Sequence, residues 1–227
     1  EDTKKMINAL MNIFDSRNIP VAVTFGNHDS EQGAMTREDL MAHYNTFSCS
    51  VSVDDGEALS GCGTYNIPVL SSNGENVKFN LWVFDSGDYD EEGRYSCVKL
   101  DQIEWYKHTS DKLKAENNGE TVNSLVFQHI IVGEIYDVLQ KTDSWKPYAF
   151  KHLYNKEEYY MFDPDRVNRG TLREYPCPGY QNFGQFDAMV EQGDVLAMFT
   201  GHDHTNAFAV EHKGIDIVNS LSTRYIG

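Results

Sequence analysis

The stretch Val21-Ala22-Val23-Thr24-Phe25-Gly26-Asn27-His28-Asp29 is a short apolar run that ends in a glycine and three polar residues. The apolar run predicts a short buried strand. Before it, residues 3–15 carry apolar side chains at spacings of three and four, which predicts a helix. A helix followed by a buried strand is typical of α/β folds. In such folds ligands bind beyond the carboxyl ends of the strands, where Asn27 and His28 lie.

Two later apolar runs end in the same way. Val126-Phe127-Gln128-His129 closes one of them, and Gly201-His202-Asp203-His204 follows the run 195–200. Two residues separated by one point the same way from an extended segment, so His202 and His204 can face one site while Asp203 turns elsewhere. Each piece alone is more typical of a polar turn, and His129 alone of a core histidine. Together, amide oxygen and imidazole nitrogens after three apolar runs predict a metal site.

The other elements follow from periodicity and turn residues. Helices are expected at 36–44, where Thr36 and Asp39 form a capping pattern, and at 101–114 and 184–191. Strands are expected at 61–70 and 78–84, joined by a turn at Asn73-Gly74, and at 124–127, 195–200, 207–210 and 215–218. Residues 142–184 hold many aromatics and prolines without periodicity. They predict an irregular aromatic-rich insertion that either packs on the domain or covers the site.

Length and composition favour one domain over residues 1–227. A chain of 227 residues with 40% hydrophobic content can bury a sizeable core. The formal net charge of −16 disfavours binding to nucleic acid or to an anionic membrane. No apolar run approaches the roughly 20 residues that cross a bilayer. The four cysteines have no CxxC spacing and are expected to be buried free thiols, with a disulfide between Cys49 and Cys62 as the alternative.

The motifs Gly26-Asn27-His28, Val126-x-x-His129 and Gly201-His202-x-His204, in this order, resemble the later motifs of the calcineurin-like metallophosphoesterases. This superfamily of two-metal phosphatases and phosphodiesterases includes the purple acid phosphatases. Gln102 and Trp105 also resemble a Gln-x-x-Trp turn of the family. The resemblance implies an α/β (α+β) fold, a four-layer αββα sandwich of two mixed β-sheets flanked by helices. The Val-x-x-His spacing is similar to that of the purple acid phosphatase branch, which favours phosphomonoesters as substrates.

The resemblance also implies the roles of the site residues. Asn27, His129 and His202 would bind one ion of a dinuclear Fe, Mn or Zn centre, and His204 the other. A metal-bound hydroxide would attack the phosphate ester, while His28 faces the substrate and protonates the leaving group. Asp29 would orient His28 or anchor the loop. His152, in the aromatic-rich insertion, is a candidate substrate contact.

One departure from the family changes the expectation for this chain. Family members begin with an Asp-x-His or Asp-x-Gly motif and then a Gly-Asp motif, and no aspartate among residues 1–25 sits in either pattern. We therefore expect the chain to lack the first strand or strands of the fold, to hold only one ion well and to be a weak or inactive catalyst. A phosphodiesterase or nucleotidase with the same ligands, and a non-catalytic binding domain, are the alternatives.

The remaining polar candidates are expected to be structural. His43, His108 and His212 have no partners in the pattern and predict solvated or packing side chains. The acidic stretch that begins Asp85-Ser86-Gly87-Asp88 lacks the spacing of an EF-hand loop and predicts a solvated turn.

Overall fold

The computed structural model of the chain describes residues 2–31, 35–54, 58–163, 165 and 169–222. Its helices are α1 (Asp2–Asp15), α2 (Arg37–Tyr44), α3 (Leu100–Glu116), the 3-10 helix η2 (Gly133–Val138) and α4 (Gln185–Gln192). Its strands are β1 (Tyr65–Leu70), β2 (Val77–Val83), β3 (Ser124–Phe127), β4 (Gln140–Thr142), β5 (Phe150–Lys151), β6 (Tyr159–Met161), β7 (Arg169–Thr171), β8 (Val195–Thr200), β9 (Ala207–His212) and β10 (Ile215–Asn219).

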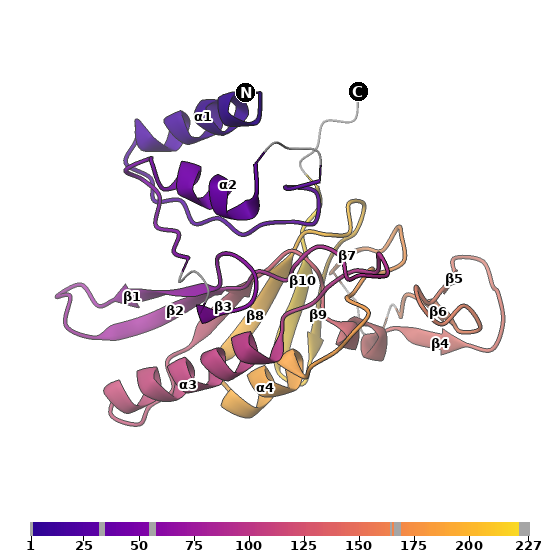
Figure 1. Ribbon diagram of the computed structural model, residues 1–227. Coiled ribbons are helices and arrows are strands. Elements are labelled where there is room, and N and C mark those ends of the chain that lie inside the picture. Colours follow the sequence, from indigo (N-terminus) through magenta and orange to yellow (C-terminus); the bar gives the residue numbers. More distant parts are fainter. Residues whose placement is uncertain (1, 32–34, 55–57, 164, 166–168, 223–227) are drawn as a thin grey trace.

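A mixed sheet of seven strands forms the centre of the molecule, in the order β1-β2-β3-β8-β10-β9-β7. The four strands β2, β3, β8 and β10 are parallel, and the outer strands pair antiparallel. Helices α3 and α4 cover one face, while α1 and α2 lie on the opposite side (Figure 1). The carboxyl ends of the parallel strands therefore meet at one edge, as the sequence predicted.

A second sheet of three antiparallel strands has the order β4-β6-β5 and lies beyond the β9 and β7 end of the large sheet (Figure 1). Its strands β5 and β6 lie within residues 142–184, which the sequence predicted to be irregular, and β4 ends at residue 142. Strand β7 of the same segment joins the large sheet. Two sheets flanked by helices confirm the predicted α+β class. Within the described residues, the layer opposite α3 and α4 consists of α1, α2 and the chain around residues 21–25 rather than a second complete sheet.

The prediction of a strand at residues 21–25 was wrong. The segment forms only a parallel bridge between Val21 and Ser50. Its other hydrogen bonds go to side chains or to neighbouring segments. Val23 N donates to Ser52 Oγ at 3.0 Å, and Thr24 Oγ1 donates to the Phe84 carbonyl at 2.9 Å. An apolar run becomes a strand only where a neighbour offers a ladder, and here the neighbour runs alongside for a few residues only.

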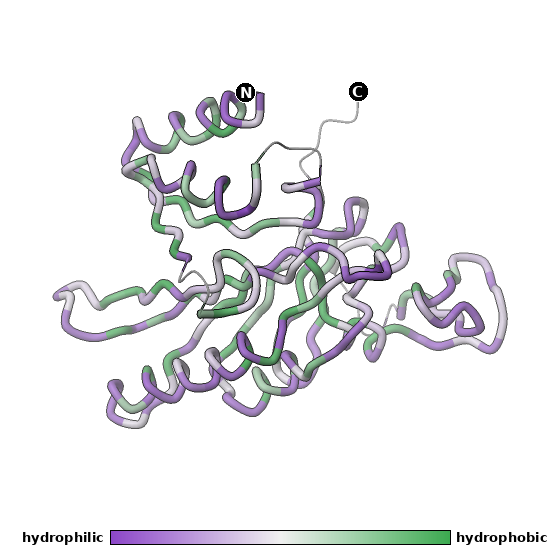
Figure 2. The backbone as a smooth tube through the Cα atoms, viewed as in Figure 1, coloured by the Kyte–Doolittle hydropathy of each residue, from purple (hydrophilic) through white to green (hydrophobic). Residues whose placement is uncertain are grey.

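The apolar side chains form two separate clusters. The larger one lies between the seven-stranded sheet and helices α3 and α4, and it includes Trp82, Tyr106 and Phe186. The smaller one, the N-terminal core, joins α1, α2 and Phe25, and its members are Ile7, Met11, Phe25, Leu40, Met41, Cys49 and Cys62. Figure 2 shows hydrophobic residues along the strands of the sheet and along the inner sides of the helices.

Local sequence signals explain where several helices begin. At α2, Thr36 Oγ1 accepts from Asp39 N and Asp39 Oδ2 accepts from Thr36 N, both at 3.2 Å, which confirms the predicted capping box. At α3, Gln102 accepts from Lys99 N at 2.7 Å and donates to Thr64 Oγ1 and to the Asp85 carbonyl. The Gln-x-x-Trp turn thus joins the helix to the end of β2, where Trp105 packs edge-on against Trp82.

A buried carboxylate, that of Asp194, joins three elements at the start of β8. It accepts hydrogen bonds from Trp82 Nε1 at 3.0 Å, from Ser124 Oγ at 3.1 Å and from the hydroxyl of Tyr106. A buried carboxylate without donors would be costly, and these three donors satisfy it. Asp194 therefore fixes β2, β3 and α3 relative to β8.

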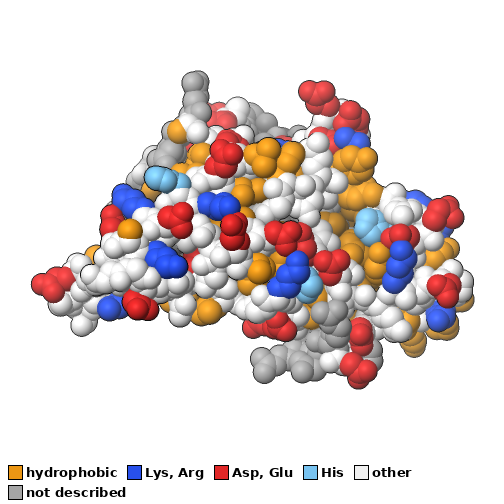
Figure 3. Space-filling model, turned by 90° about the horizontal axis from the view of Figure 1, so that it is seen from below, with side chains coloured by type: hydrophobic (Ala, Val, Ile, Leu, Met, Phe, Trp, Pro, Cys, Tyr) orange, Lys and Arg blue, Asp and Glu red, His pale blue; other side chains and the backbone are white. Residues whose placement is uncertain are grey.

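The described cysteines are free thiols, of which Cys49 and Cys62 are buried and Cys97 and Cys177 partly buried. Among the described residues, no helix is both long and apolar enough to cross a bilayer. On the face seen from below, basic side chains lie singly among acidic ones (Figure 3). This distribution agrees with the net charge of −16, which disfavours polyanionic partners.

Candidate metal centre

The pairing of β3 with β8 places two of the predicted ligands side by side. The strands run parallel, with Phe127 opposite Phe199. Directly after them, the amides of Gly201 and His202 both donate to the His129 carbonyl at 3.1 Å. The chain that carries His129 is thereby tied to the loop that carries His202, so the two imidazoles meet at the edge of the sheet.

Three donor atoms converge at this edge. His129 Nε2 lies 3.0 Å from Asn27 Oδ1 and 3.2 Å from His202 Nδ1. Asn27 is fully buried and His202 is 6% exposed. His129 therefore contacts both Asn27 and His202, the two residues that the family resemblance predicted to share an ion with it.

The protonation states of His129 and His202 suit the binding of a cation. Burial, and then the neighbouring histidines, lowers the pKa of His129 to about 4 and that of His202 to about 3, so both imidazoles are neutral near pH 7. Asn27 Oδ1 cannot donate, and His129 Nε2 carries at most one proton to share between its two neighbours. The buried His202 Nε2 has no hydrogen-bond partner among the described atoms. Lone pairs in excess of protons are what a divalent ion satisfies, and the set of imidazole and amide donors suits one.

His204 and His28 lie on the other side of a hollow next to this trio. Their ring centroids are 6.3 Å apart, and both line a cavity of about 220 Å³ together with His202 and Asp203. Tyr95 and the segment 174–177 complete the wall. Among the described residues, no three His, Cys, Asp or Glu side chains gather closely enough to hold an ion by themselves, so the trio with Asn27 is the best-formed donor set.

Gly26 is required by the close approach of His129. A Cβ at position 26 would lie 2.9 Å from both Cε1 and Nε2 of the His129 ring, closer than side chains normally pack. In the same loop, the Asp29 carboxylate accepts a hydrogen bond from Gly26 N at 2.6 Å. Of the two roles predicted for Asp29, the contact supports anchoring of the loop.

His28 itself is bound by a residue that the sequence did not indicate. His28 Nδ1 lies 2.5 Å from Glu31 Oε2, and the side chain of His28 is 59% exposed. On the other side of the site, Asp203 accepts from Cys177 N and from Asn206 Nδ2, both at 3.1 Å. Its carboxylate anchors the loop, as expected of a residue that turns from the site, although Asp203 also lines the cavity; burial raises its pKa to about 6.

The prediction that the acidic turn beginning at Asp85 is solvated was wrong for Asp85 itself. Asp85 is 2% exposed and forms an ion pair with Arg37, whose Nη2 also donates to the Gly26 carbonyl at 3.0 Å. Asp85 further accepts from Cys62 N and Gly87 N, both at 2.8 Å. The sequence signal was present, since Asp85 directly follows the apolar run of β2, but its partner lies 48 residues away.

The other histidines have structural contacts. His152 Nδ1 accepts from the amides of Tyr154 and Asn155, and its ring lies 4.0 Å from that of Tyr136. The residue stabilises a turn and does not line the 220 Å³ cavity, so its predicted contact with substrate stays a prediction. His43 bonds Asn8, and His212 stacks on Phe186. His108 is exposed. These three agree with the solvated or packing roles expected of them.

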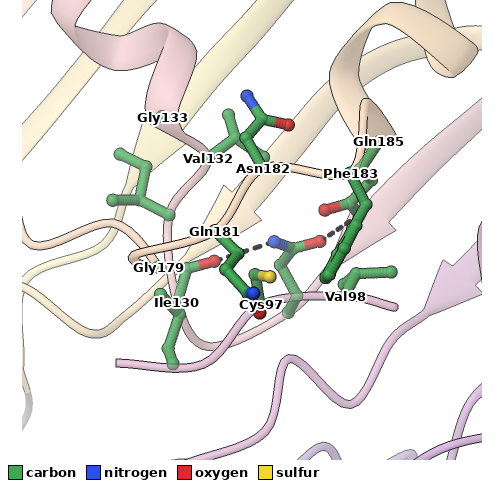
Figure 4. A pocket seen from close by; sticks show the side chains of 12 residues that line it. Cys97, Val98, Ile130, Val132, Gly133, Gly179, Gln181, Asn182, Phe183 and Gln185 are labelled. Atoms are coloured by element: carbon green, nitrogen blue, oxygen red, sulfur yellow. Dashed lines mark hydrogen bonds between the residues drawn. The ribbon is translucent and has the colours of Figure 1, made fainter. Parts of the chain in front are cut away.

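A small cavity of about 20 Å³ lies between the chain on either side of His129, which contributes Gln128 and Ile130, and Gln185 at the start of α4 (Figure 4). Gln128 spans it, with Nε2 donating to the Ile130 carbonyl at 2.7 Å and Oε1 accepting from Gln185 at 2.5 Å. Both bonds are drawn in Figure 4. They fix the residue before His129 and so restrict the orientation of the imidazole.

The edge of the parallel strands carries one amide and two neutral imidazoles, a donor set that suits a divalent ion. Comparison with known proteins gives the family of this α+β domain. Residues 2–206 match the calcineurin-like phosphoesterase family, and the chain belongs to that family. The resemblance stated from the motifs is confirmed.

Two curated proteins and one solved structure are similar to this chain. Probable inactive purple acid phosphatase 29 of Arabidopsis thaliana is 29% identical, over 96% of this chain and 54% of its own length. Probable inactive purple acid phosphatase 14 of the same plant is 30% identical, over 92% of this chain and 51% of its own. A crystal structure of a dimetal phosphatase from Danio rerio covers 95% of this chain and 76% of that one at 13% identity and a TM-score of 0.46. The chain spans about half the length of the curated relatives it matches.

Proposed function

We propose that the protein is a metal-dependent phosphoric-ester hydrolase whose metal ligands include Asn27, His129 and His202. The observation that carries the proposal is the contact of three donor atoms, at 3.0 and 3.2 Å, from three distant segments. A bound divalent ion would neutralise phosphoryl oxygens and provide a nucleophile near neutral pH. Iron, manganese and zinc all accept this mixed donor set.

The other residues of the site have roles that their positions permit. His28 is exposed at the cavity and engaged only through Nδ1 in the described contacts, which leaves Nε2 to protonate the leaving oxygen. His204 shares the cavity and is the candidate ligand of a second ion. These assignments give one ion three ligands and the second ion only His204, so we expect this chain to hold one ion well and to turn over slowly.

Phosphomonoesters are the favoured substrate class. A cavity of about 220 Å³ is smaller than the roughly 300–1,000 Å³ of sites for drug-sized ligands, which suits a small ester. The similarity to proteins named purple acid phosphatases points the same way. A phosphodiesterase or nucleotidase with the same ligands is the alternative within the family.

A domain that binds metal or phosphate without turnover is the second candidate. It is favoured by the names of the two Arabidopsis relatives, both probable inactive phosphatases. Such a domain would bind the ion through Asn27, His129 and His202, and it would not need His28 as a proton donor.

Calorimetric titration with Zn²⁺ or Mn²⁺, beside an aryl phosphate assay, separates the candidates. We expect the protein to bind about one ion, to lose binding in His202→Ala and to keep it in His28→Ala, with the exposed His108→Ala as control. Weak metal-dependent turnover that disappears in His28→Ala supports the hydrolase. Binding without turnover supports the second candidate, and no binding by the unaltered protein contradicts both.

A further inference from the structure

His28 and Asn27 are adjacent in sequence, but the side chain of Asn27 is buried and that of His28 is exposed. Two other residues, Glu31 and Tyr89, connect them through hydrogen bonds. Glu31 holds His28 through a contact of 2.5 Å between His28 Nδ1 and Glu31 Oε2. Tyr89 holds Asn27, whose Nδ2 donates to the Tyr89 hydroxyl at 2.7 Å. The Tyr89 hydroxyl also interacts with the Glu31 side chain. The contacts thus run from His28 through Glu31 and Tyr89 to Asn27.

The protonation states of the four residues determine which group donates and which accepts in each of these hydrogen bonds. The bonds from His28 and from Tyr89 lower the pKa of the Glu31 carboxyl, so Glu31 is a carboxylate that can only accept. The single hydroxyl proton of Tyr89 is therefore donated to Glu31, and the hydroxyl oxygen accepts from Asn27. A phenol held in this way prefers the NH₂ end of the Asn27 amide. The Oδ1 end is then turned toward His129, 3.0 Å away.

This orientation matters because an asparagine amide has one end that binds metal and one that does not. The oxygen is a metal ligand, whereas the NH₂ group would repel an ion. On the other side of the bridge, the Glu31 contact fixes a proton on His28 Nδ1, so Nε2 is the nitrogen that faces other partners. Tyr89 is itself held in place, because its ring stacks on Tyr95, which packs edge-on against His202 at 4.4 Å.

We propose that Glu31 and Tyr89 form a hydrogen-bonded bridge between His28 and Asn27 and act as positioning residues for both. The bridge sets the tautomer of His28 and the orientation of the Asn27 amide. It rests on the proposed function only for the roles given to His28 and Asn27, and its geometry can be tested without turnover. The alternative is that Glu31 and His28 form an ordinary exposed pair, which would influence neither residue 27 nor metal binding.

Tyr89→Phe tests the end of the bridge at Asn27, because it removes the hydroxyl and keeps the ring. We expect Zn²⁺ affinity, measured by calorimetry, to fall about tenfold or more, as for other residues that support a ligand from behind. In the metal-free protein, the side-chain NH₂ proton signals of Asn27 in NMR spectra should shift as they lose their acceptor. Tyr148→Phe, at a position 93% exposed, is the matched control and should change neither readout.

Glu31→Ala tests the end at His28, with Glu31→Gln as the conservative variant that keeps an acceptor. Nitrogen-15 NMR of the metal-free protein at pH 8 should show His28 protonated on Nδ1 in the unaltered protein and in Glu31→Gln. In Glu31→Ala the proton should move largely to Nε2, and Zn²⁺ affinity should fall because Tyr89 loses its acceptor. Glu104→Gln, on an exposed position of α3, is the control.

The outcomes separate failure of the bridge from failure of the proposed function. If Zn²⁺ binds and requires His202, but Tyr89→Phe and Glu31→Ala bind it as tightly as the unaltered protein, the bridge is overturned. An unchanged His28 tautomer in Glu31→Ala, or unchanged Asn27 signals in Tyr89→Phe, overturns it equally. If the unaltered protein binds no Zn²⁺, the proposed function fails, while the two NMR readouts still decide on the bridge.

Discussion

The N-terminal region and the large sheet are held together in different ways. The sheet region has an extensive core and a buried carboxylate that joins its elements. The N-terminal region, residues 2–54, depends on the small N-terminal core, and its helix α1 leaves Met6 73%, Leu10 49% and Ile13 52% exposed. We infer that the N-terminal region opens at lower free energy than the sheet, because fewer apolar side chains are buried there.

This difference bears directly on the candidate metal centre, because its proposed ligands come from both regions. Asn27 belongs to the N-terminal region, and His129 and His202 follow strands of the sheet. Polar contacts join the regions, among them the ion pair of Arg37 with Asp85 and the bond from Tyr65 to the Val23 carbonyl at 2.7 Å, and Cys62 packs into the N-terminal core. The geometry of the site therefore depends on how firmly the N-terminal region is attached.

The largest effect is expected from Asp85→Ala, which breaks the attachment. It removes the nearest ion-pair partner of the Arg37 guanidinium, which is 10% exposed, and the acceptor of two amides. Removing one member of a buried pair costs about 3–5 kcal/mol. Urea denaturation should show a loss of this size, and hydrogen exchange should accelerate first in residues 2–54.

Asp187→Ala is the matched control, because its pair with Lys213 is exposed on both sides. A loss below about 1 kcal/mol is expected there. If Asp85→Ala costs as little as Asp187→Ala, the ion pair does not hold the regions together.

The same deletion made in each core compares the regions directly. Met11 in the N-terminal core and Met198 in the sheet core are both fully buried. Replacement of either by alanine should cost about 2–5 kcal/mol. Hydrogen exchange is the measurement: Met11→Ala should release amides of α1 and α2 while β3 and β8 stay protected, and Met198→Ala should lower protection in both regions. Equal loss of protection everywhere in both variants would mean that the molecule has one cooperative core.

Metal binding should raise the free energy of unfolding of the N-terminal region, because the proposed ligands come from that region and from the sheet. At a free Zn²⁺ concentration 100 times the dissociation constant, the stabilisation is about 2.7 kcal/mol. Thermal denaturation with Zn²⁺ and after chelation measures it, and hydrogen exchange should slow around Asn27. His202→Ala should abolish the gain, and His108→Ala should keep it. Stabilisation that survives in His202→Ala would place the ion elsewhere.

The smallest expected effect is that of Gly26→Ala, at the point where the regions touch. The added Cβ would press on the His129 ring, so Zn²⁺ affinity should fall about tenfold, or about 1.4 kcal/mol. Gly201→Ala is the control within the same site, since a Cβ there meets nothing within 4 Å. Calorimetry that gives equal affinities for the two variants would show that His129 can move aside without cost.

The sequence was informative where local patterns agree with the fold. The runs 124–127 and 195–200 are strands with the predicted bounds, and the capping pattern of Thr36 and Asp39 was confirmed. Convergence of His129 and His202 was predictable, because polar residues that follow parallel strands share an edge. Asn27 contacts His129 although the segment before it forms only a bridge. Their roles as ligands, and that of His204, remain predictions.

The features that were missed depend on partners far away in the sequence or on elements too short to show a period. Residues 21–25 read as a strand, yet only Val21 finds a backbone partner in a bridge. Asp85 read as solvated because its partner Arg37 lies in another region. Strands β4 to β7 have two or three residues each, too few for any alternation to be visible. Tyr89 and Glu31 gave no signal, since only the folded loop brings them together.

The parallel register of β3 and β8 determines the spacing of the two imidazoles in the candidate metal centre. With Phe127 opposite Phe199, His129 comes two residues and His202 three residues after a matched pair. Inserting or deleting one residue in either strand would displace one imidazole by about 3.3 Å along the sheet and turn its neighbours to the opposite face. Substitutions that conserve polarity can be absorbed in these strands, whereas a change in their length would separate the proposed ligands even with every one of them retained.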